Sequence, residues 1–275
     1  MFAAGGKTAI AVMGKKIITL TTDFGNSSPY VAAMKGAVLS LNPSATLVDL
    51  THAVPPQNIR QAAIGLVTST QTYPEGTIHI IVVDPGVGTD RSLVCALING
   101  SYFLAPDNGV LDALARAHKV DKIIALTNAS YWLPQVSNTF HGRDILAPVA
   151  AHLSLDTPIE LLGDPLNSLT TLTWPKVKVM PGKIEGIIES IDSFGNLISN
   201  IDEEQLGDVP RDDSVRILCD EHETQGIFQT YGDQPAMTLI TLIGSGGKLE
   251  LAIVDDSAAI MLGIGVGAKI TLSWS

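Results

Sequence analysis

Residues 81–91 read I-V-V-D-P-G-V-G-T-D-R. The preceding run 77–83 is apolar, rich in β-branched residues and as long as a buried strand, and Asp84 stands at its end. A glycine turn follows, and Arg91 comes seven residues after the aspartate. Ligands bind at the carboxyl ends of strands in open α/β sheets, so this stretch predicts both a fold and a site. The plain alternative is that Asp84 caps a turn and Arg91 is a solvated surface charge.

The segments around this stretch alternate between strand and helix patterns. Up to residue 83 we expect strands at 17–22, 46–50 and 77–83, and helices at about 29–41 and from Pro55 to about Thr72. This order favours right-handed crossovers and a largely parallel sheet. Further on we expect a hairpin at 93–98 and 102–105, a helix at 110–118, a strand at 122–126 and a helix at about 143–154.

The pattern changes after about Pro165, where short strand-like runs replace the helices. They lie at 184–191, 214–218, 226–231, 238–243, 249–254 and 268–273. This spacing is typical of a small β-barrel or sandwich. We therefore predict a mixed α/β protein with a leader at 1–16, an α/β N-terminal domain with a mostly parallel sheet at 17–165, a linker at 166–182 and a C-terminal β-barrel domain at 183–275.

The composition narrows the class of protein. Hydrophobic residues make up 45% of the 275 residues and charged residues 16%, which excludes disorder. The net charge of −11 argues against nucleic acid or an anionic membrane as a partner. No apolar run reaches the ~18 residues that a spanning helix needs. Cys95 and Cys219 form no metal or redox spacing, so we expect a reduced, cytoplasmic setting.

Familiar cofactor motifs are absent from the sequence. It contains neither the G-x-G-x-x-G of a dinucleotide fold nor a P-loop nor a G-x-S-x-G nucleophile elbow. Residues 86–88 resemble half of a dinucleotide loop but lack the third glycine. His141 and His152 do not give an established zinc-ligand spacing. We therefore expect neither a cofactor nor a metal ion.

Polar residues instead gather at the predicted ends of strands and turns. In the first domain they are Asp23, Asp84, Arg91, Asp107, Asn108, His141, Arg143 and Asp144. As a neutral imidazole beside a charged partner, His141 would suit a base, and otherwise it caps or packs against a helix. In the second domain, residues 191–196 combine a carboxylate, an aromatic ring and an amide. That set suits a planar, hydrogen-bonding ring beside a cation, although an ordinary β-turn has the same composition.

Six motifs occur in order along the chain. They are T-T-D-F-G at 21–25, M-K-G at 34–36, V-D-P-G-V-G-T-x-R at 83–91, A-P-D-N-G at 105–109, F-H-G-R-D at 140–144 and I-D-x-F-G-N-L-I-S-N-I at 191–201. On these motifs the chain resembles the S-adenosyl-L-methionine hydrolase (adenosine-forming) family, also called SAM hydroxide adenosyltransferases. That family is related to fluorinase and chlorinase. The resemblance runs from about Ile17 to the C-terminus.

The resemblance implies that water or hydroxide attacks the ribose C5′ of S-adenosyl-L-methionine, giving adenosine and L-methionine. It implies Asp84, Arg91 and His141 as the catalytic set. The implied substrate contacts are Asp23 for the ribose, Asp192 for the methionine ammonium, Phe194 and Asn196 for the adenine, Tyr231 for stacking on the adenine and Ser245 for the methionine carboxylate. It also implies a homotrimer whose active sites lie between the N-terminal domain of one subunit and the C-terminal domain of its neighbour.

Two alternatives stay open at this point. A halogenase of the same fold is the nearer one, but those relatives carry tyrosine at the position of Asp84, whose charge would repel a halide. A module that binds S-adenosyl-L-methionine without turnover would not explain Asp84, Arg91 and His141 together. The chain departs from the family at Ser28, where family members often carry aspartate, so a hydrogen bond at that position is in question.

Overall fold

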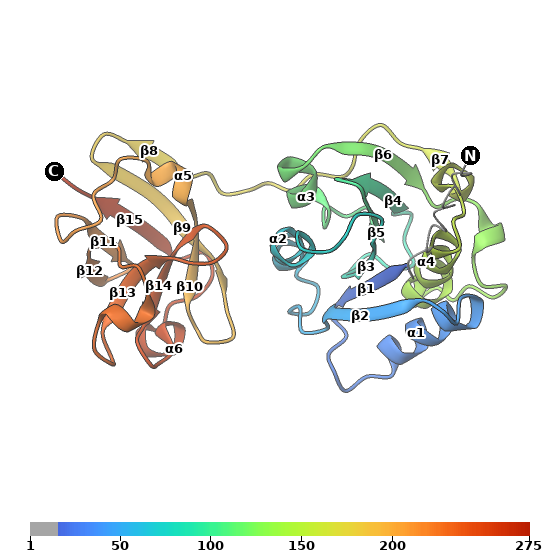
Figure 1. Ribbon diagram of the computed structural model, residues 1–275, viewed down its shortest axis with the longest axis horizontal. Coiled ribbons are helices and arrows are strands. Elements are labelled where there is room, and N and C mark those ends of the chain that lie inside the picture. The colour runs from blue at the N-terminus through green and yellow to red at the C-terminus, as the bar shows by residue number, and fades with distance from the viewer. Residues whose placement is uncertain (1–15) are drawn as a thin grey trace, which may run out of the picture. The chain divides into compact units, whose positions relative to one another are not determined.

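A computed structural model describes residues 16–275 and divides the chain into two compact units. The first unit ends at Leu172, and the second spans Thr173–Ser275 (Figure 1). Each unit has a hydrophobic core of its own. Apart from Lys16, the leader predicted at 1–16 lies outside the described residues.

The first unit is built on a seven-stranded sheet in the order β2-β1-β3-β5-β4-β6-β7. Its strands are β1 (Ile17–Thr22), β2 (Thr46–Thr51), β3 (Ile78–Val82), β4 (Leu93–Ile98), β5 (Ser101–Pro106), β6 (Val120–Ala125) and β7 (Asp164–Pro165). The first four strands of this order are parallel, and β4, β6 and β7 add antiparallel pairs. The loops that follow β1, β2 and β3 therefore leave the sheet at the same edge.

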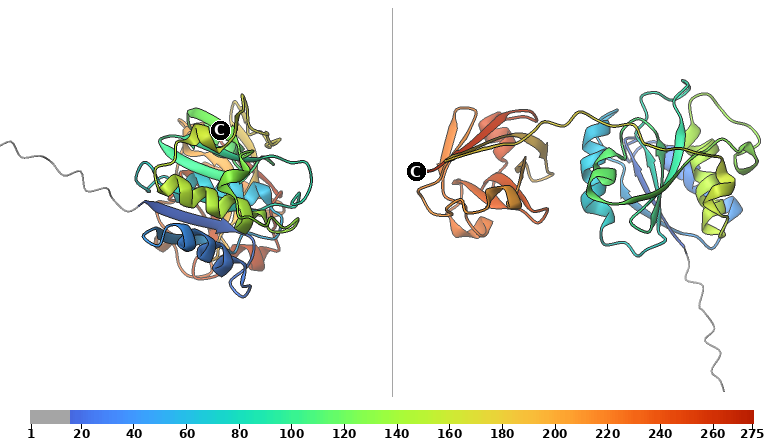
Figure 2. Two further views of the ribbon diagram at one scale, coloured as in Figure 1. Left: turned by 90° about the vertical axis from the view of Figure 1, so that its right-hand side faces the viewer. Right: turned by 90° about the horizontal axis from the view of Figure 1, so that it is seen from above.

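Helices cover both faces of this sheet (Figure 2). They are α1 (Tyr30–Leu41), α2 (Ile59–Thr70), α3 (Asp112–Ala117) and α4 (Ala147–Ser154), with short turns η1 (Ala129–Tyr131), η2 (Gly142–Leu146) and η3 (Ile159–Leu162). Side chains alternate across a strand, so Ile80 packs in the core under α1 and α4, whereas Ile81 packs in the core under α2 and α3. None of the helices formed by residues 16–275 has the length and apolar character of a membrane-crossing segment.

Local sequence explains several of these elements. Asn58 caps α2, since its side chain accepts a hydrogen bond from the Gln61 N–H. Asn99 and Gly100 both have positive φ (47° and 76°), which matches the turn of the predicted β4–β5 hairpin. The helix predicted at 143–154 begins instead as the π-helical turn η2 and continues as α4. The predicted mixed α/β class and mostly parallel N-terminal sheet are confirmed.

The second unit is an antiparallel eight-stranded sheet in the order β12-β11-β15-β9-β10-β14-β13, with β8 paired to β9. Its elements are β8 (Lys178–Met180), β9 (Lys183–Ile191), β10 (Leu197–Asp202), α5 (Glu203–Leu206), β11 (Arg216–Cys219), β12 (His222–Gln225), η4 (Tyr231–Asp233), β13 (Leu239–Ile243), β14 (Lys248–Ile253), α6 (Ala258–Leu262) and β15 (Lys269–Ser273). The two ends of this order meet where Thr224 Oγ1 donates to the Leu239 carbonyl oxygen (2.7 Å). The sheet is therefore a nearly closed barrel, as predicted.

The strand predicted at 226–231 is wrong. The strand in this region is β12 at 222–225, which forms a hairpin with β11 through Asp220 (φ 53°). Gly226 then takes a positive φ of 76°, which ends the strand, and only one isolated bridge follows, between Phe228 and Leu242. The residues after the glycine looked like a strand because their pattern is the same as that of the strand-like runs elsewhere in this unit. Strands β8 and β10 and the short helices α5 and α6 have no counterpart among the predicted elements.

Candidate active site

The turn after β3 begins at the edge of the sheet where the parallel strands end. Asn108 Nδ2 donates to the Val83 carbonyl oxygen (2.9 Å) and so fixes the end of this strand. Gly88 has a φ of +81°, and a Cβ at this position would lie 2.6 Å from the Asn138 carbonyl oxygen. Both the positive φ and the contact with Asn138 exclude a side chain at Gly88. The glycine therefore allows the chain to reverse direction in this turn.

Asp84 and Arg91 form a close, largely buried ion pair across this turn. Arg91 Nε lies 2.9 Å and 2.8 Å from the two carboxylate oxygens of Asp84, and Nη2 also contacts Oδ2. The side chains are only 6% exposed for Asp84 and 11% exposed for Arg91. A guanidinium held by several hydrogen bonds to one carboxylate has a fixed orientation. The contact between Asp84 and Arg91 that the sequence predicted is therefore confirmed.

His141 joins this pair from a distant part of the chain. Its Nδ1 lies 2.9 Å from Arg91 Nη2. Arginine has no acceptor atom, so Nδ1 must accept this hydrogen bond and the ring proton lies on Nε2. Burial and the neighbouring charge of Arg91 lower the pKa of His141, and Asp84, Asp144 and a hydrogen bond to the backbone of Ser137 only partly offset this. The imidazole is therefore neutral and carries its proton on Nε2.

The loop before His141 is anchored by Asp144. This buried carboxylate accepts hydrogen bonds from the Ser137 N–H (2.8 Å), the Ser137 hydroxyl (2.7 Å) and Arg143 Nε (2.6 Å). Burial alone would raise the pKa of Asp144, but these hydrogen bonds lower it. Arg143 and Asp144 thus hold the π-helical turn that presents His141, and they make no contact with Asp84 or Arg91.

Three aromatic rings connect the His141 turn with the loop after β1. Phe24, Tyr30 and Phe140 pack edge to face, with ring centroids 5.2–5.8 Å apart. Tyr30 is 51% exposed. The cluster gives this edge of the sheet an apolar wall between Asp23 and His141.

Asp23 lies in the loop after β1 and is half-buried. Its Oδ2 accepts a hydrogen bond from the Gln57 N–H (2.7 Å), and no hydrogen bond to Oδ1 is found within residues 16–275. Ser28, at the position where the family often has aspartate, donates from Oγ to the Phe24 carbonyl oxygen (3.1 Å). The serine therefore keeps a hydrogen bond within this loop.

A buried histidine that the sequence did not single out supports the same loop. His52 Nδ1 lies 2.9 Å from Thr22 Oγ1, and the His52 carbonyl oxygen accepts from the Gly25 N–H (2.8 Å). Thr22 Oγ1 also accepts from the Phe24 N–H (3.3 Å), so the hydroxyl joins the loop backbone to the His52 ring. His52 Nε2 lies 3.0 Å from Asp49 Oδ1. The residue before Asp23 is thus tied to the end of β2.

In the second unit, Asp192 organises the turn between β9 and β10. Its Oδ1 accepts from the N–H groups of Phe194 (2.9 Å) and Asn196 (2.8 Å), and its Oδ2 accepts from Asn196 Nδ2 (2.9 Å). The turn leaves the Phe194 ring 78% exposed and buries Asn196. The ordinary role of Asp192 in a turn and its expected role in binding are compatible, because the carboxylate keeps further lone pairs.

Tyr231 lies against this turn and connects it to a residue that the sequence analysis missed. Its hydroxyl lies 3.4 Å from Asn196 Nδ2 and donates to Glu250 Oε2 (3.1 Å). The sequence feature that could have pointed to Glu250 is that it is the one charged residue within the apolar strand 249–253. Ser245 lies in the exposed turn between β13 and β14, and within residues 16–275 it shares no hydrogen bond with this group. The structure thus gathers Asp192, Asn196 and Tyr231 but leaves Ser245 outside.

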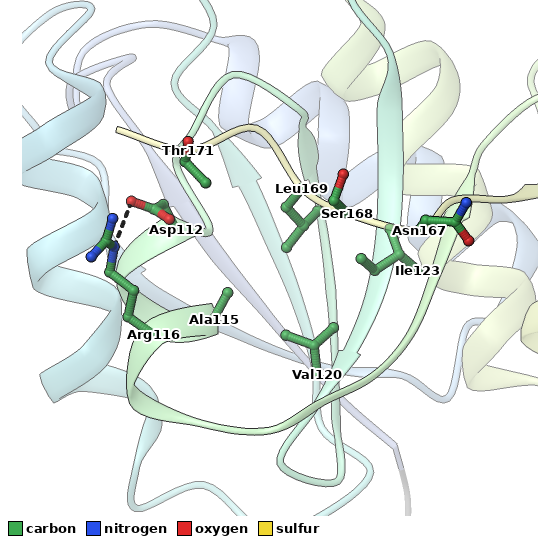
Figure 3. A pocket seen from close by; sticks show the side chains of 9 residues that line it. All are labelled: Asp112, Ala115, Arg116, Val120, Ile123, Asn167, Ser168, Leu169 and Thr171. Carbon is green, nitrogen blue, oxygen red and sulfur yellow. Dashed lines mark hydrogen bonds and ion pairs between the residues drawn. The ribbon is translucent and has the colours of Figure 1, made fainter. Parts of the chain in front are cut away.

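A separate hollow in the first unit is lined in part by the segment 167–171 (Figure 3). Its lining includes the apolar side chains of Val120, Ile123 and Leu169 and the Asp112–Arg116 ion pair. None of the predicted site residues lines it. The hollow is therefore not the site that Asp84, Arg91 and His141 form.

Comparisons with known proteins match both units of the chain. Residues 18–163 match the SAM hydroxide adenosyltransferase N-terminal domain, and residues 186–271 match the SAM hydroxide adenosyltransferase C-terminal domain. The chain is 36% identical to the (R)-S-adenosyl-L-methionine hydrolase of Thermus thermophilus, covering 91% of this chain and 97% of that protein. It is 29% identical to a fluorinase of an Actinoplanes species, covering 94% and 98%. An uncharacterised conserved protein from Thermotoga maritima has a similar crystal structure, with a TM-score of 0.88, 37% identity and coverage of 94% and 99%.

Proposed function

Because the chain belongs to the SAM hydroxide adenosyltransferase family, we propose that it hydrolyses S-adenosyl-L-methionine to adenosine and L-methionine. The single observation that carries this proposal is the contact of Asp84, Arg91 and His141 at the edge of the sheet. A binding module has no need of a buried ion pair with a neutral imidazole beside it. A halogenase would have to bring a halide to the negative charge of Asp84.

The chemistry asks little of the leaving group, because a sulfonium leaves as a neutral thioether. What the protein must supply is an oxygen nucleophile in line with the C5′–S bond, at about 3–3.5 Å from the carbon. We assign the Nε2–H of His141 and the guanidinium of Arg91 as the donors that hold this oxygen. The oxygen bonds to C5′, the electron pair of the C5′–S bond stays on sulfur, and the proton of the water goes to Asp84.

Asp84 is the proton acceptor in this proposal because His141 has no lone pair to spare. The Nδ1 lone pair of the neutral imidazole is already engaged by Arg91. The Oδ1 atom of Asp84 accepts only from Arg91 Nε within the described residues, so it has room for a further proton donor. The positive charge of Arg91 also favours the hydroxide form of the nucleophile. No additional cofactor is needed for this step.

The stereochemistry at sulfur is part of the proposal. The name of the Thermus relative specifies the (R) form of S-adenosyl-L-methionine. Since "L" already fixes the amino acid carbon, the (R) descriptor refers to the sulfonium sulfur. We propose that the present chain also acts on the (R) sulfonium epimer. Our assignments of the substrate contacts to Asp23, Asp192, Phe194, Asn196, Tyr231 and Ser245 follow the family resemblance.

We further propose that the protein is a homotrimer that works in the cytoplasm. In this assembly, the Asp84 group of one subunit and the Asp192 group of its neighbour would form each active site. The support is that the two groups belong to different units of the chain, while each holds only part of the expected contacts. The cytoplasmic location is supported by Cys95 and Cys219, which are both buried and free.

One assay tests the proposed reaction. Purified protein is incubated with the (R) and, separately, the (S) sulfonium epimer, with and without chloride or fluoride, and the products are resolved by chromatography. Equal amounts of adenosine and methionine, independent of halide and faster from the (R) epimer, are expected. A 5′-halogenated nucleoside would establish the halogenase alternative instead. Bound but unchanged substrate would establish a binding module.

A further inference from the structure

Glu250 is a buried carboxylate without a cationic partner. It lies on β14, is 7% exposed, and is flanked along the strand by Leu249 and Leu251. No lysine, arginine or histidine among residues 16–275 lies within ion-pair distance of it, and its one hydrogen bond there comes from the Tyr231 hydroxyl. The fold also makes room for it, because a Cβ on Gly244 would lie 1.7 Å from its Oε1. Burying a carboxylate without a cationic partner costs free energy of folding. This cost indicates that Glu250 has a function at this position.

The direction of the hydrogen bonds shows what this carboxylate does. Glu250 can only accept when ionised, so the Tyr231 proton points to it and the phenol oxygen is left as an acceptor. Asn196 Nδ2 has two protons, and it faces Asp192 Oδ2 at 2.9 Å and this phenol oxygen at 3.4 Å. Two carboxylates thus direct the amide nitrogen from opposite ends. The amide orientation follows from that network, and the nitrogen is turned inward.

The other end of the amide, Asn196 Oδ1, then becomes the recognition atom. No hydrogen bond to it is found within the described chain. Asn196 is only 7% exposed, but its Oδ1 is not among the buried atoms left without a partner, so a ligand can reach it. An amide oxygen accepts a hydrogen bond from an amino group and repels a carbonyl oxygen. Once a bound ligand covers such an acceptor, it discriminates between ligands, because the wrong ligand leaves it unpaired.

We propose that Glu250 is a positioning residue that acts through Tyr231, holding Asn196 so that its amide oxygen selects a purine with a 6-amino group. The inference rests on the proposed function, in which Asn196 meets the adenine of the substrate. It extends that function by assigning the choice of an adenine over a 6-oxopurine to a carboxylate that does not touch the base.

The charge of Glu250 makes this choice dependent on pH. Burial raises the pKa of Glu250, the hydrogen bond from Tyr231 lowers it, and the charge of Asp192 raises it, with a net upward shift. Tyr231 and Asp192 are the titratable groups that face it. A protonated Glu250 can donate to the phenol oxygen, and the network then loses its direction. Selectivity for the 6-amino group should therefore weaken as the pH falls toward the range where Glu250 protonates.

The test measures the affinities of the full-length protein for adenosine and for inosine by calorimetry. The wild-type protein should prefer adenosine, and Glu250→Met should reduce this preference by about tenfold. Tyr231→Phe should have the same effect, and the double variant should be no worse than either single one. Glu250→Gln keeps an acceptor for Tyr231, so it should retain most of the preference but lose its dependence on pH. Thr241→Val, which removes a buried hydrogen bond on the neighbouring strand β13, should leave the preference unchanged.

The proposal is overturned if folded Glu250→Met keeps the wild-type preference. If that variant does not fold, Tyr231→Phe decides, because Tyr231 is 41% exposed and its ring is retained. A wild-type protein that binds neither adenosine nor S-adenosyl-L-methionine would overturn the proposed function itself. These failures differ, since the first leaves adenosine binding intact and the second abolishes it.

Discussion

His141 Nδ1 accepts a hydrogen bond from Arg91 Nη2 at 2.9 Å. The direction of this bond follows from chemistry alone, because a guanidinium only donates. It makes His141 a neutral donor through Nε2 and leaves the carboxylate of Asp84 as the basic group of the three. In our proposal, the imidazole therefore orients the nucleophile, and Asp84 takes its proton.

Asp84→Asn should lower kcat by about 100-fold or more, because the amide has the size of the carboxylate but accepts a proton poorly. The affinity for S-adenosyl-L-methionine should stay within several-fold, since Asp84 meets the nucleophile in our proposal. Single-turnover kinetics together with equilibrium binding separate the two quantities. Asp90→Asn in the same turn is the control, since Asp90 is exposed and should leave both values unchanged. A fully active Asp84→Asn would rule out Asp84 as the acceptor.

Protonation of His141 should set the acid limb of the kcat profile. Burial and Arg91 lower its pKa from the ordinary value of 6.5, so the ring stays neutral at and above this pH. Activity should fall only as the pH drops below about 6.5, where a charged imidazole would face the guanidinium. The limb should disappear in His141→Gln, whose residual activity should be flat over the same range. An acid limb that persists in this variant would assign the titration to another group.

His52→Leu should raise the KM for S-adenosyl-L-methionine. The change removes the partner of the Thr22 hydroxyl and loosens the loop that carries Asp23. It should also lower the free energy of unfolding by about 1–3 kcal/mol, because buried polar groups lose their partner. Steady-state kinetics and denaturant unfolding measure the two effects. His118→Leu, at the half-buried end of α3, is the matched control and should change neither value much.

His79 should make the protein less stable in acid. It is buried on β3, hydrogen-bonded from Nδ1 to Thr19 Oγ1 (2.7 Å) and stacked on Phe103, and burial lowers its pKa to about 4. The unfolded state, with a pKa near 6.5, binds the proton first, so stability is full above about pH 6.5 and declines toward pH 4. The loss should reach about 3 kcal/mol.

Urea unfolding at several pH values measures this loss. The double variant His79→Leu with Thr19→Val removes the titrating group and its partner, so its stability should fall less steeply over the same range. An unchanged slope would show that another group controls the acid limb.

Gly244→Ala should weaken adenosine binding although the backbone there accepts a side chain. The added Cβ would lie 1.7 Å from Glu250 Oε1 and 2.2 Å from its carboxylate carbon, so the Glu250 side chain must move away from Tyr231. A loss of about tenfold in adenosine affinity is expected, measured by calorimetry. Gly246→Ala in the same turn meets no atom within 4 Å and is the control. Equal affinities for the two variants would contradict the expectation.

Much of the fold followed from local sequence patterns. The alternating strands and helices up to β3, the hairpin at Asn99 and Gly100 and the change to β structure after Pro165 are all properties of short segments. Where local patterns were ambiguous the prediction failed. The apolar residues of 226–231 looked like a strand, yet Gly226 ends β12 before them.

For the site, the sequence alone determined which residue types stand at the ends of the strands, since motifs and strand ends are local. It placed Asp84, Arg91 and His141 in one set through the family resemblance. Only the tertiary structure decided that His141, fifty residues from Arg91, is the acceptor in their contact, and that Glu250 directs Asn196 through Tyr231. Such directions depend on which donors and acceptors meet across the fold, and no local pattern contains that information.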